Sequence, residues 1–151
     1  MTEETKGQVK REYPEAPLVG VGTVTVNNGK ILLIKRAFDP GAGKWSIPGG
    51  LIEVGEKLSE AGKRETEEET GIKVEILELI NVFDMIDLDD SKKVKYHYVL
   101  VDFLAKPVGG KERLSSEVTE IKWAGWEEAK TMDLTRTARK ALEELFGGVM
   151  T

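Results

Sequence analysis

Hydrophobic and polar positions divide the first third of the chain into two short extended segments joined by a turn. Residues 18–26 are rich in β-branched side chains, and residues 30–36 have a continuously apolar centre. Both patterns are typical of β-strands, the second of a strand inside a sheet. Between them stands Asn27-Asn28-Gly29, a sequence typical of a tight hairpin turn. The pattern therefore predicts a β-hairpin over residues 18–36.

The pattern alternates between extended segments and loops in most of the remaining chain. A short extended piece at 45–47 leads into a turn at Pro48-Gly49-Gly50, where the backbone can approach a ligand closely. Further strands are expected at 73–83, 94–105 and 118–123, and loops at 38–44, 84–93 and 107–116. The second half of 94–105 is apolar on both faces, which predicts a central strand.

Two segments have the period of an α-helix. The first covers about 57–70 and is followed by Gly71, a residue typical of helix ends. Its Gly62 falls on the inward face, so we expect close packing against a strand there. The second begins at a cap, Asp133 or Thr135, and has apolar residues at helical spacing. The order β-β-α-β-β-β-α predicts an α/β fold, an α/β/α sandwich with a mixed sheet between helices.

The first helix carries three carboxylates at positions i, i+3 and i+4, namely Glu65, Glu68 and Glu69. At about 100° per residue, Glu65 and Glu69 continue the stripe of apolar and small residues that faces the protein. Glu68 lies at the edge of this stripe, and Glu67 points to water. A solvated acidic helix face is the simpler interpretation, but inward carboxylates are costly unless they are paired or bound to metal. The phase of the helix therefore predicts a divalent cation among them.

Composition narrows the class of protein. The chain has 151 residues, no cysteine and a net charge of −5, from 22 basic and 27 acidic residues. We expect a single domain over 1–151 with residues 1–17 as a flexible or edge segment. No apolar run approaches the ~20 residues of a membrane span, and we expect a cytoplasmic protein without disulfides. The sequence has no stripe of basic residues of the kind that binds nucleic acid. An acidic protein that handles a polyanion must recruit cations.

The segment from Gly50 to Ile72 resembles the signature of a known family. Gly50, Glu56, Arg64-Glu65, Glu68-Glu69 and Gly71-Ile72 match eight of the nine specified positions of the Nudix box. That box marks hydrolases of nucleoside diphosphates linked to another moiety. The one departure is Thr66, where the family usually has an aliphatic residue; a threonine methyl can pack in the same place.

The resemblance implies a metal site that agrees with the helix phase. In the family, the positions of Glu65, Glu68 and Glu69 bind Mg²⁺ or Mn²⁺, together with a backbone carbonyl at the position of Gly49. Oxygen ligands suit these hard cations. The cations neutralise the diphosphate and activate water, and a carboxylate takes the proton.

The resemblance also implies roles for residues around that site. Arg64 and Glu56 resemble the ion pair that ties the family's loop to its helix, although a surface salt bridge is the simpler interpretation. The general base is Glu69 or Glu68 within the box, or a carboxylate on a later loop. For that loop, residues 115–120 are the candidate region, and Glu117 is the first choice.

Substrate contacts are expected from the second strand and from the loop that follows it. Arg36 and Lys44 are candidates for holding phosphate oxygens, or else ordinary surface residues. The candidates for a group that stacks on the base are Trp45, Phe38, Phe83, Tyr96 and Tyr98, although aromatic residues on strands are more often part of the core. His97, the single histidine, is expected to be packed or at the surface.

Among Nudix enzymes the chain looks like the ADP-ribose pyrophosphatase branch, which yields AMP and ribose 5-phosphate. One departure is that no proline lies between Ile72 and Pro107, where many ADP-ribose-selective members carry one. The alternative is a nucleoside triphosphate-sanitising enzyme of the 8-oxo-dGTP type. A non-catalytic nucleotide sensor is the third interpretation, but all the carboxylates of the box are present. A homodimer is compatible with the branch.

Overall fold

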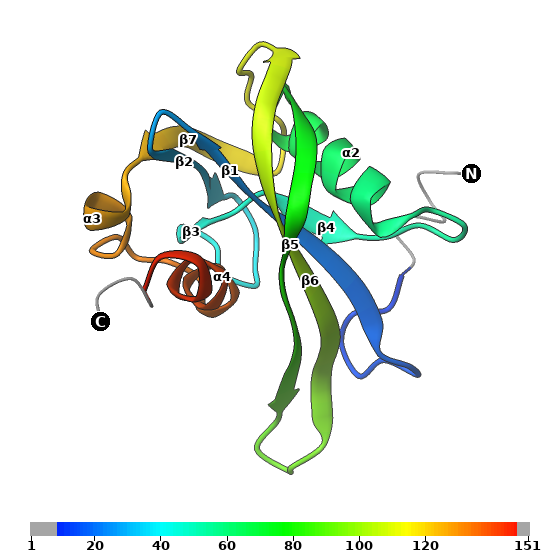
Figure 1. Cartoon of the computed structure of the whole chain (residues 1–151). Coiled ribbons are helices and arrows are strands. Elements are labelled where there is room, and N and C mark those ends of the chain that lie inside the picture. Colours follow the sequence, from blue (N-terminus) through cyan, green and yellow to red (C-terminus); the bar gives the residue numbers. More distant parts are fainter. Residues whose placement is uncertain (1–8, 148–151) are drawn as a thin grey trace.

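The computed structural model describes residues 9–147, and Figure 1 shows how its strands and helices are arranged. The strands are β1 (Leu18–Asn27), β2 (Lys30–Arg36), β3 (Trp45–Ser46), β4 (Gly49–Leu51), β5 (Ile72–Leu88), β6 (Val94–Gly110) and β7 (Val118–Ala124). The helices are α2 (Leu58–Thr70), α3 (Trp126–Ala129) and α4 (Arg136–Phe146).

The strands form one mixed sheet in the order β3-β2-β1-β6-β5, with β4 paired to β1 and β7 paired to β2. Of the pairings between these strands in residues 9–147, only β1–β6 is parallel. Because successive residues of a strand face opposite sides, β1 separates two layers. Thr23 lies against Gly62 of α2, whereas Val24 shares a buried cluster with Ala138 and Leu142 of α4. The predicted mixed sheet between helices is confirmed (Figure 1).

Local signals placed several elements correctly. The β1–β2 hairpin turns at Asn28 and Gly29, with φ angles of 52° and 76°, as a two-residue hairpin turn requires. Helix α2 ends at Gly71, whose φ is 79° and whose N–H donates to the carbonyl of Glu67. Of the two cap candidates for α4, Thr135 is the cap, and its hydroxyl accepts from the N–H of Ala138.

The acidic turn expected at 84–93 is wrong over its first half. Strand β5 continues through Leu88, and Asp84 and Asp87 are paired with Val99 and Tyr96 of β6. The turn itself is formed at Asp89, whose Oδ1 accepts from the N–H groups of residues 91 and 93. The two acidic residues interrupt the apolar alternation, but pairing to β6 satisfies the backbone, so the strand persists.

Two other segments expected to be a loop and a turn are also partly β-strand. Strand β6 runs to Gly110, so the loop predicted from Pro107 begins too early; a register irregularity at Lys73/Val74 accommodates the proline opposite it. The turn expected at Pro48–Gly50 is partly strand β4, in which Gly49 and Gly50 pair with β1. Both errors come from pairing partners that are distant in sequence.

The structure tests only part of the expectation that residues 1–17 form a flexible or edge segment. Residues 1–8 lie outside the described residues. Residues 9–17 form neither helix nor strand, but Tyr13 donates its hydroxyl to Asp89, 2.8 Å away, and its N–H to the carbonyl of Lys95. This segment therefore lies along the β5–β6 hairpin. In the described part of the chain, no helix is long and apolar enough to cross a membrane.

Candidate active site

Helix α2 turns Glu65 and Glu69 inward as the phase of the sequence predicts, but the expected exposure of Glu67 and Glu68 is wrong, because Glu68 is the more exposed of the two. Glu65 and Glu69 are buried, with 7% and 6% of their surface exposed, while Glu68 is exposed and Glu67 is half-buried. Thr66 is fully buried, and its hydroxyl hydrogen-bonds the hydroxyl of Thr23 and the carbonyl of Gly62. A threonine therefore fills this interior position without leaving its hydroxyl unpaired.

The two glycines of β4 bring the sheet against these carboxylates. The N–H of Gly49 donates to Oε1 of Glu69 at 2.9 Å. At Gly50, a β-carbon would collide with the carboxylate of Glu65. Glycine is needed here because any side chain would displace Glu65, so the sequence Gly49-Gly50 serves the carboxylate cluster directly.

Arg64 links the loop after β4 to the helix. Its Nε and Nη2 donate to the two carboxylate oxygens of Glu56, at 2.7 and 2.9 Å, and Nη2 also reaches the carbonyl of Leu51 at 3.1 Å. Its Nη1 contacts Glu65 and Glu68. The hydrogen bond that Arg64 donates to Glu56 is the main cause that raises the pKa of Arg64. The expected Arg64–Glu56 pair is present as a bidentate, partly buried contact, not a loose surface bridge.

Burial raises the pKa of Glu69 to about 8. The charges of Glu65 and Glu117 raise this pKa further, whereas the N–H of Gly49 and the charge of Arg36 lower it. Glu117 lies on the exposed loop before β7, and its carbonyl accepts from the N–H of Ala37, the residue after Arg36. Folding therefore brings the predicted Glu117 and Arg36 close enough to act electrostatically on Glu69.

These carboxylates fit a hard divalent cation in their chemistry. They are all-oxygen donors, and a buried carboxylate whose pKa is raised by burial and by a second carboxylate is a group that a cation stabilises. Within residues 9–147, however, no group of three or more acidic or histidine side chains is gathered as a metal cage. Glu65 and Glu68 contact Arg64. A metal would therefore compete with this arginine for their oxygens.

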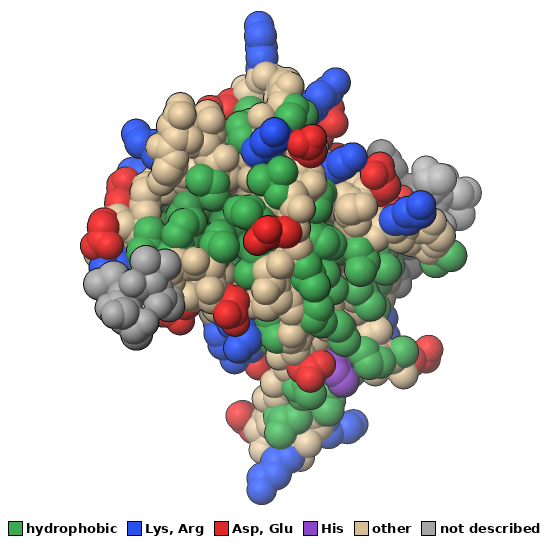
Figure 2. All heavy atoms as spheres, in the orientation of Figure 1, with side chains coloured by type: hydrophobic (Ala, Val, Ile, Leu, Met, Phe, Trp, Pro, Cys, Tyr) green, Lys and Arg blue, Asp and Glu red, His purple; other side chains and the backbone are tan. Residues whose placement is uncertain are grey.

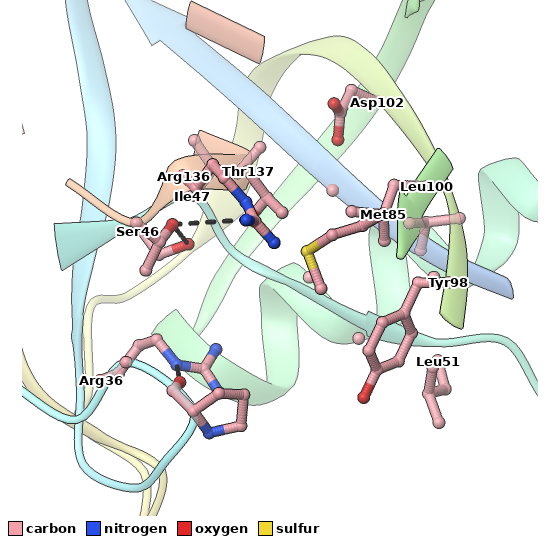
Figure 3. Close-up of a pocket in the computed structure, with 18 of the residues that line it drawn as sticks. Arg36, Ser46, Ile47, Leu51, Met85, Tyr98, Leu100, Asp102, Arg136 and Thr137 are labelled. Carbon is pink, nitrogen blue, oxygen red and sulfur yellow. Dashed lines mark hydrogen bonds between the residues drawn. The ribbon is translucent and has the colours of Figure 1, made fainter. Parts of the chain in front are cut away.

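A cavity of about 430 Å³ lies beside Gly49 and Gly50. Arg36 and Lys44, the two predicted phosphate contacts, both line it. Figure 3 shows Arg36 on one side of the cavity and an apolar wall of Leu51, Met85 and Leu100 with Tyr98 on the other. Tyr98 is the aromatic candidate that reaches the cavity. A basic side next to an apolar and aromatic wall suits a ligand with both phosphates and a nucleoside.

Sequence reasoning missed four charged residues of this cavity, Arg11, Asp87, Asp102 and Arg136. Arg136 begins α4 and pairs with Asp87 of β5 at 2.7 Å. Asp102 lies on β6 opposite Gly22 of β1. The available signal was the pair of glycines in strand β1, Gly20 and Gly22, because a glycine inside a strand often marks a close approach of another group.

Comparison with known proteins was consistent across sequence and structure. A family model described as NUDIX domain matches residues 16–145. An ADP-ribose pyrophosphatase of Methanocaldococcus jannaschii is 33% identical over 107 residues, 71% of this chain and 61% of the relative. The chain thus matches less than two thirds of that relative's length. Nucleoside triphosphatase NudI of an Enterobacter species is 32% identical over 123 residues, 75% of this chain and 85% of the relative.

A solved structure agrees with these sequence matches. The MutT NUDIX hydrolase from Burkholderia pseudomallei superposes with a TM-score of 0.74 at 36% sequence identity, over 86% of this chain and 98% of that one. The likeness extends over the sheet and the helices, not only over the segment from Gly50 to Ile72.

Proposed function

This chain belongs to the Nudix family of hydrolases, and on that premise we propose that it splits the diphosphate of ADP-ribose into AMP and ribose 5-phosphate. One observation carries the proposal: a buried carboxylate cluster on α2 stands behind Gly49 and Gly50, and a cavity with a basic side and an apolar wall opens in front of them. The name of the M. jannaschii relative supports the choice of substrate.

Nudix hydrolases use divalent metal ions, and we propose Mg²⁺ here, with Mn²⁺ as a substitute. Glu65, Glu68, Glu69 and the carbonyl of Gly49 would hold it. When bound, the ion supplies neutralising charge for the diphosphate and lowers the pKa of water. The N–H of Gly49 keeps the Glu69 carboxylate at the cavity edge, and Arg64 with Glu56 positions the helix on which the carboxylates stand.

The reaction needs a proton acceptor and a phosphate clamp. Water attacks phosphorus, one phosphorus–oxygen bond of the anhydride breaks, and the water proton passes to a carboxylate. Glu69 or Glu68 serves as this base, or Glu117 does; the electrostatic effect of Glu117 on Glu69 supports its place near the reaction. Arg36 and Lys44 hold phosphate oxygens, a role supported by their position in the cavity wall.

A second candidate is a nucleoside triphosphate pyrophosphohydrolase of the 8-oxo-dGTP type. The name of the NudI relative favours it. A substrate panel separates the two: ADP-ribose, 8-oxo-dGTP, NADH and a dinucleoside polyphosphate, each with and without Mg²⁺, with products identified by chromatography. Highest kcat/KM for ADP-ribose supports the proposal, and highest kcat/KM for the triphosphate supports the alternative. Tight binding of one nucleotide without turnover of any would instead identify a sensor.

We further propose a single catalytic domain that forms a homodimer through β5. This strand is the edge of the main sheet path, and Leu79, Val82, Ile86 and Leu88 on it are each at least half exposed. Figure 2 shows hydrophobic side chains that continue from the centre of this face down the projecting hairpin. An exposed apolar edge strand is a template for strand pairing, and a second copy offers the same edge. The cytoplasmic location expected from the sequence stays a prediction.

A further inference from the structure

Asp102 is a buried carboxyl that the reaction proposed above does not use. It lies in the middle of β6 with 4% of its surface exposed, and it lines the cavity. Its Oδ2 is buried without a hydrogen-bond partner among the described residues. Burial raises the pKa of this carboxyl to about 7. A buried carboxyl without a partner destabilises a protein, so its presence in a cavity wall points to a partner that arrives with the ligand.

The surrounding backbone leaves room for this carboxyl. Gly22 stands beside Asp102 on the neighbouring strand, and a β-carbon there would lie 2.6 Å from Oδ1. On the other side, Asn81 is the residue opposite Asp102 on β5. Its amide atoms are also buried and without a partner among the described residues. Neither neighbouring strand therefore fixes the carboxyl by a hydrogen bond.

Asp102 lies across the cavity from Arg36. Figure 3 places Asp102 and Arg36 on opposite sides of the cavity, with the guanidinium of Arg136 between them. Asp102 comes two residues after Leu100 on β6 and therefore shares its face of the strand. A carboxylate repels phosphate, and the phosphates have Arg36 and its hydrogen-bonded neighbour Lys44 at the other side. The part of a nucleotide that can reach Asp102 is its nucleoside, which carries N–H and O–H donors.

We propose that Asp102 is a specificity-determining residue that accepts a hydrogen bond from a donor of the substrate's nucleoside, either the amino group of the base or a ribose hydroxyl. This inference rests on the proposed function for the identity of the nucleotide. A site that hydrogen-bonds a donor discriminates strongly against analogues without it, because the buried carboxyl is then left unpaired. Asp102 touches the substrate but not the reacting phosphorus.

The test measures equilibrium binding of AMP and of ribose 5-phosphate, without Mg²⁺, by titration calorimetry. Asp102→Leu keeps the volume and removes both oxygens, and Asp102→Asn is the closer isostere. Asp84→Asn is the matched control, because Asp84 is an exposed carboxylate on β5 outside the cavity. We expect Asp102→Leu to weaken AMP binding about tenfold or more, as for a lost hydrogen bond to a charged group. Ribose 5-phosphate binding should change less than about twofold if the donor is the amino group of the base, and should weaken together with AMP binding if the donor is a ribose hydroxyl. The Asp84→Asn control should match the parent.

Two analogues identify the donor. If IMP, which lacks the amino group, binds parent and variant equally, the base amine is the donor. If 2′-deoxy-AMP does so, the 2′-hydroxyl is the donor, and a loss that persists with both analogues assigns the 3′-hydroxyl.

Parent-like AMP binding by both Asp102 variants, or no measurable AMP binding by the parent, would overturn the proposal. An equal loss of AMP binding in the Asp84→Asn control would also overturn it. Circular dichroism and Tm establish that each variant is folded, and Asp102→Asn keeps the test open if Asp102→Leu does not fold. Because binding of products is measured, the outcome does not depend on turnover. A chain that fails to hydrolyse ADP-ribose can still show the Asp102 effect, and an active enzyme can lack it.

Discussion

At the scale of single residues, the chain retains carboxyl groups at the cavity whose burial destabilises the folded state. Glu69 and Asp102 are both buried, and burial raises the pKa of each. Glu69 has the N–H of Gly49 as a partner, whereas Oδ2 of Asp102 has none in the described chain. A buried ionised carboxyl costs more than a neutral one, so the stability of the protein must depend on pH.

The raised pKa of Asp102 determines the direction in which stability changes with pH. Its ordinary pKa is 3.8 and its pKa in the fold is about 7, so the folded state holds the proton more tightly. The contribution to stability is complete below about pH 4 and is lost as the pH rises through 7. Relative to Asp102→Asn, the parent should lose roughly 4 kcal/mol of unfolding free energy between pH 4 and pH 8. Urea unfolding of both proteins across this range measures the difference, and parallel curves would refute the assignment.

The sequence predicted the residues of the box, the inward orientation of Glu65 and Glu69, and the basic residues Arg36 and Lys44 of the cavity, but not the rest of the cavity wall. The phase of one helix is enough to turn Glu65 and Glu69 inward, and the spacing is readable without any tertiary information. Asp102, Arg11 and Arg136 meet at the cavity only because β6 pairs in parallel with β1 and α4 starts beside β5. No local pattern carries that information, and glycines in β1 were the one indirect sign.

At the scale of elements, α2 and the preceding loop act as one unit. Arg64 joins them by its two bonds to Glu56 and one to the carbonyl of Leu51, with both side chains mostly buried. The helix boundary and its glycine end followed from local signals. The lengths of β5 and β6 did not, because each strand continues past its polar residues or proline through pairing with the other.

Arg64→Met should therefore cost about 2 kcal/mol or more of unfolding free energy, because it leaves the Glu56 carboxylate without its bidentate partner. Lys63→Met is the matched control: Lys63 is exposed and pairs with Glu60 of the same helix, a contact worth about 0.5 kcal/mol or less. Urea denaturation at pH 7 compares the two. Equal losses for both variants would mean that the Arg64 bridge does not hold the loop.

At the scale of the whole molecule, the sheet separates two tasks. Helix α2 supplies the carboxylates on one face of the sheet. The cavity is lined by residues of β1, β5 and β6 and by the start of α4. Strand β4, with its two glycines, lies between the carboxylates and the cavity. The long β5–β6 hairpin extends beyond both layers and leaves an apolar edge exposed (Figure 1).

If two copies pair through this edge, Val82→Lys with Ile86→Lys should convert the protein from dimer to monomer in light scattering. Each lysine places a charge on the apolar edge, which disfavours strand pairing. Val108→Lys is the control, because Val108 is equally exposed but lies on β6. It should leave the dimer intact. A monomeric parent, or a double variant that stays dimeric, would contradict the proposed interface.

The most direct test of the central claim is hydrolysis of ADP-ribose by Glu69→Gln as Mg²⁺ is titrated, with Glu67→Gln as the matched control. Both substitutions change one carboxylate of α2, but only Glu69 accepts the N–H of Gly49 beside the cavity. We expect Glu69→Gln to keep its fold and lose at least about a hundredfold in kcat at saturating Mg²⁺. Glu67→Gln should stay within about twofold of the parent. Near-normal turnover by Glu69→Gln would contradict the account.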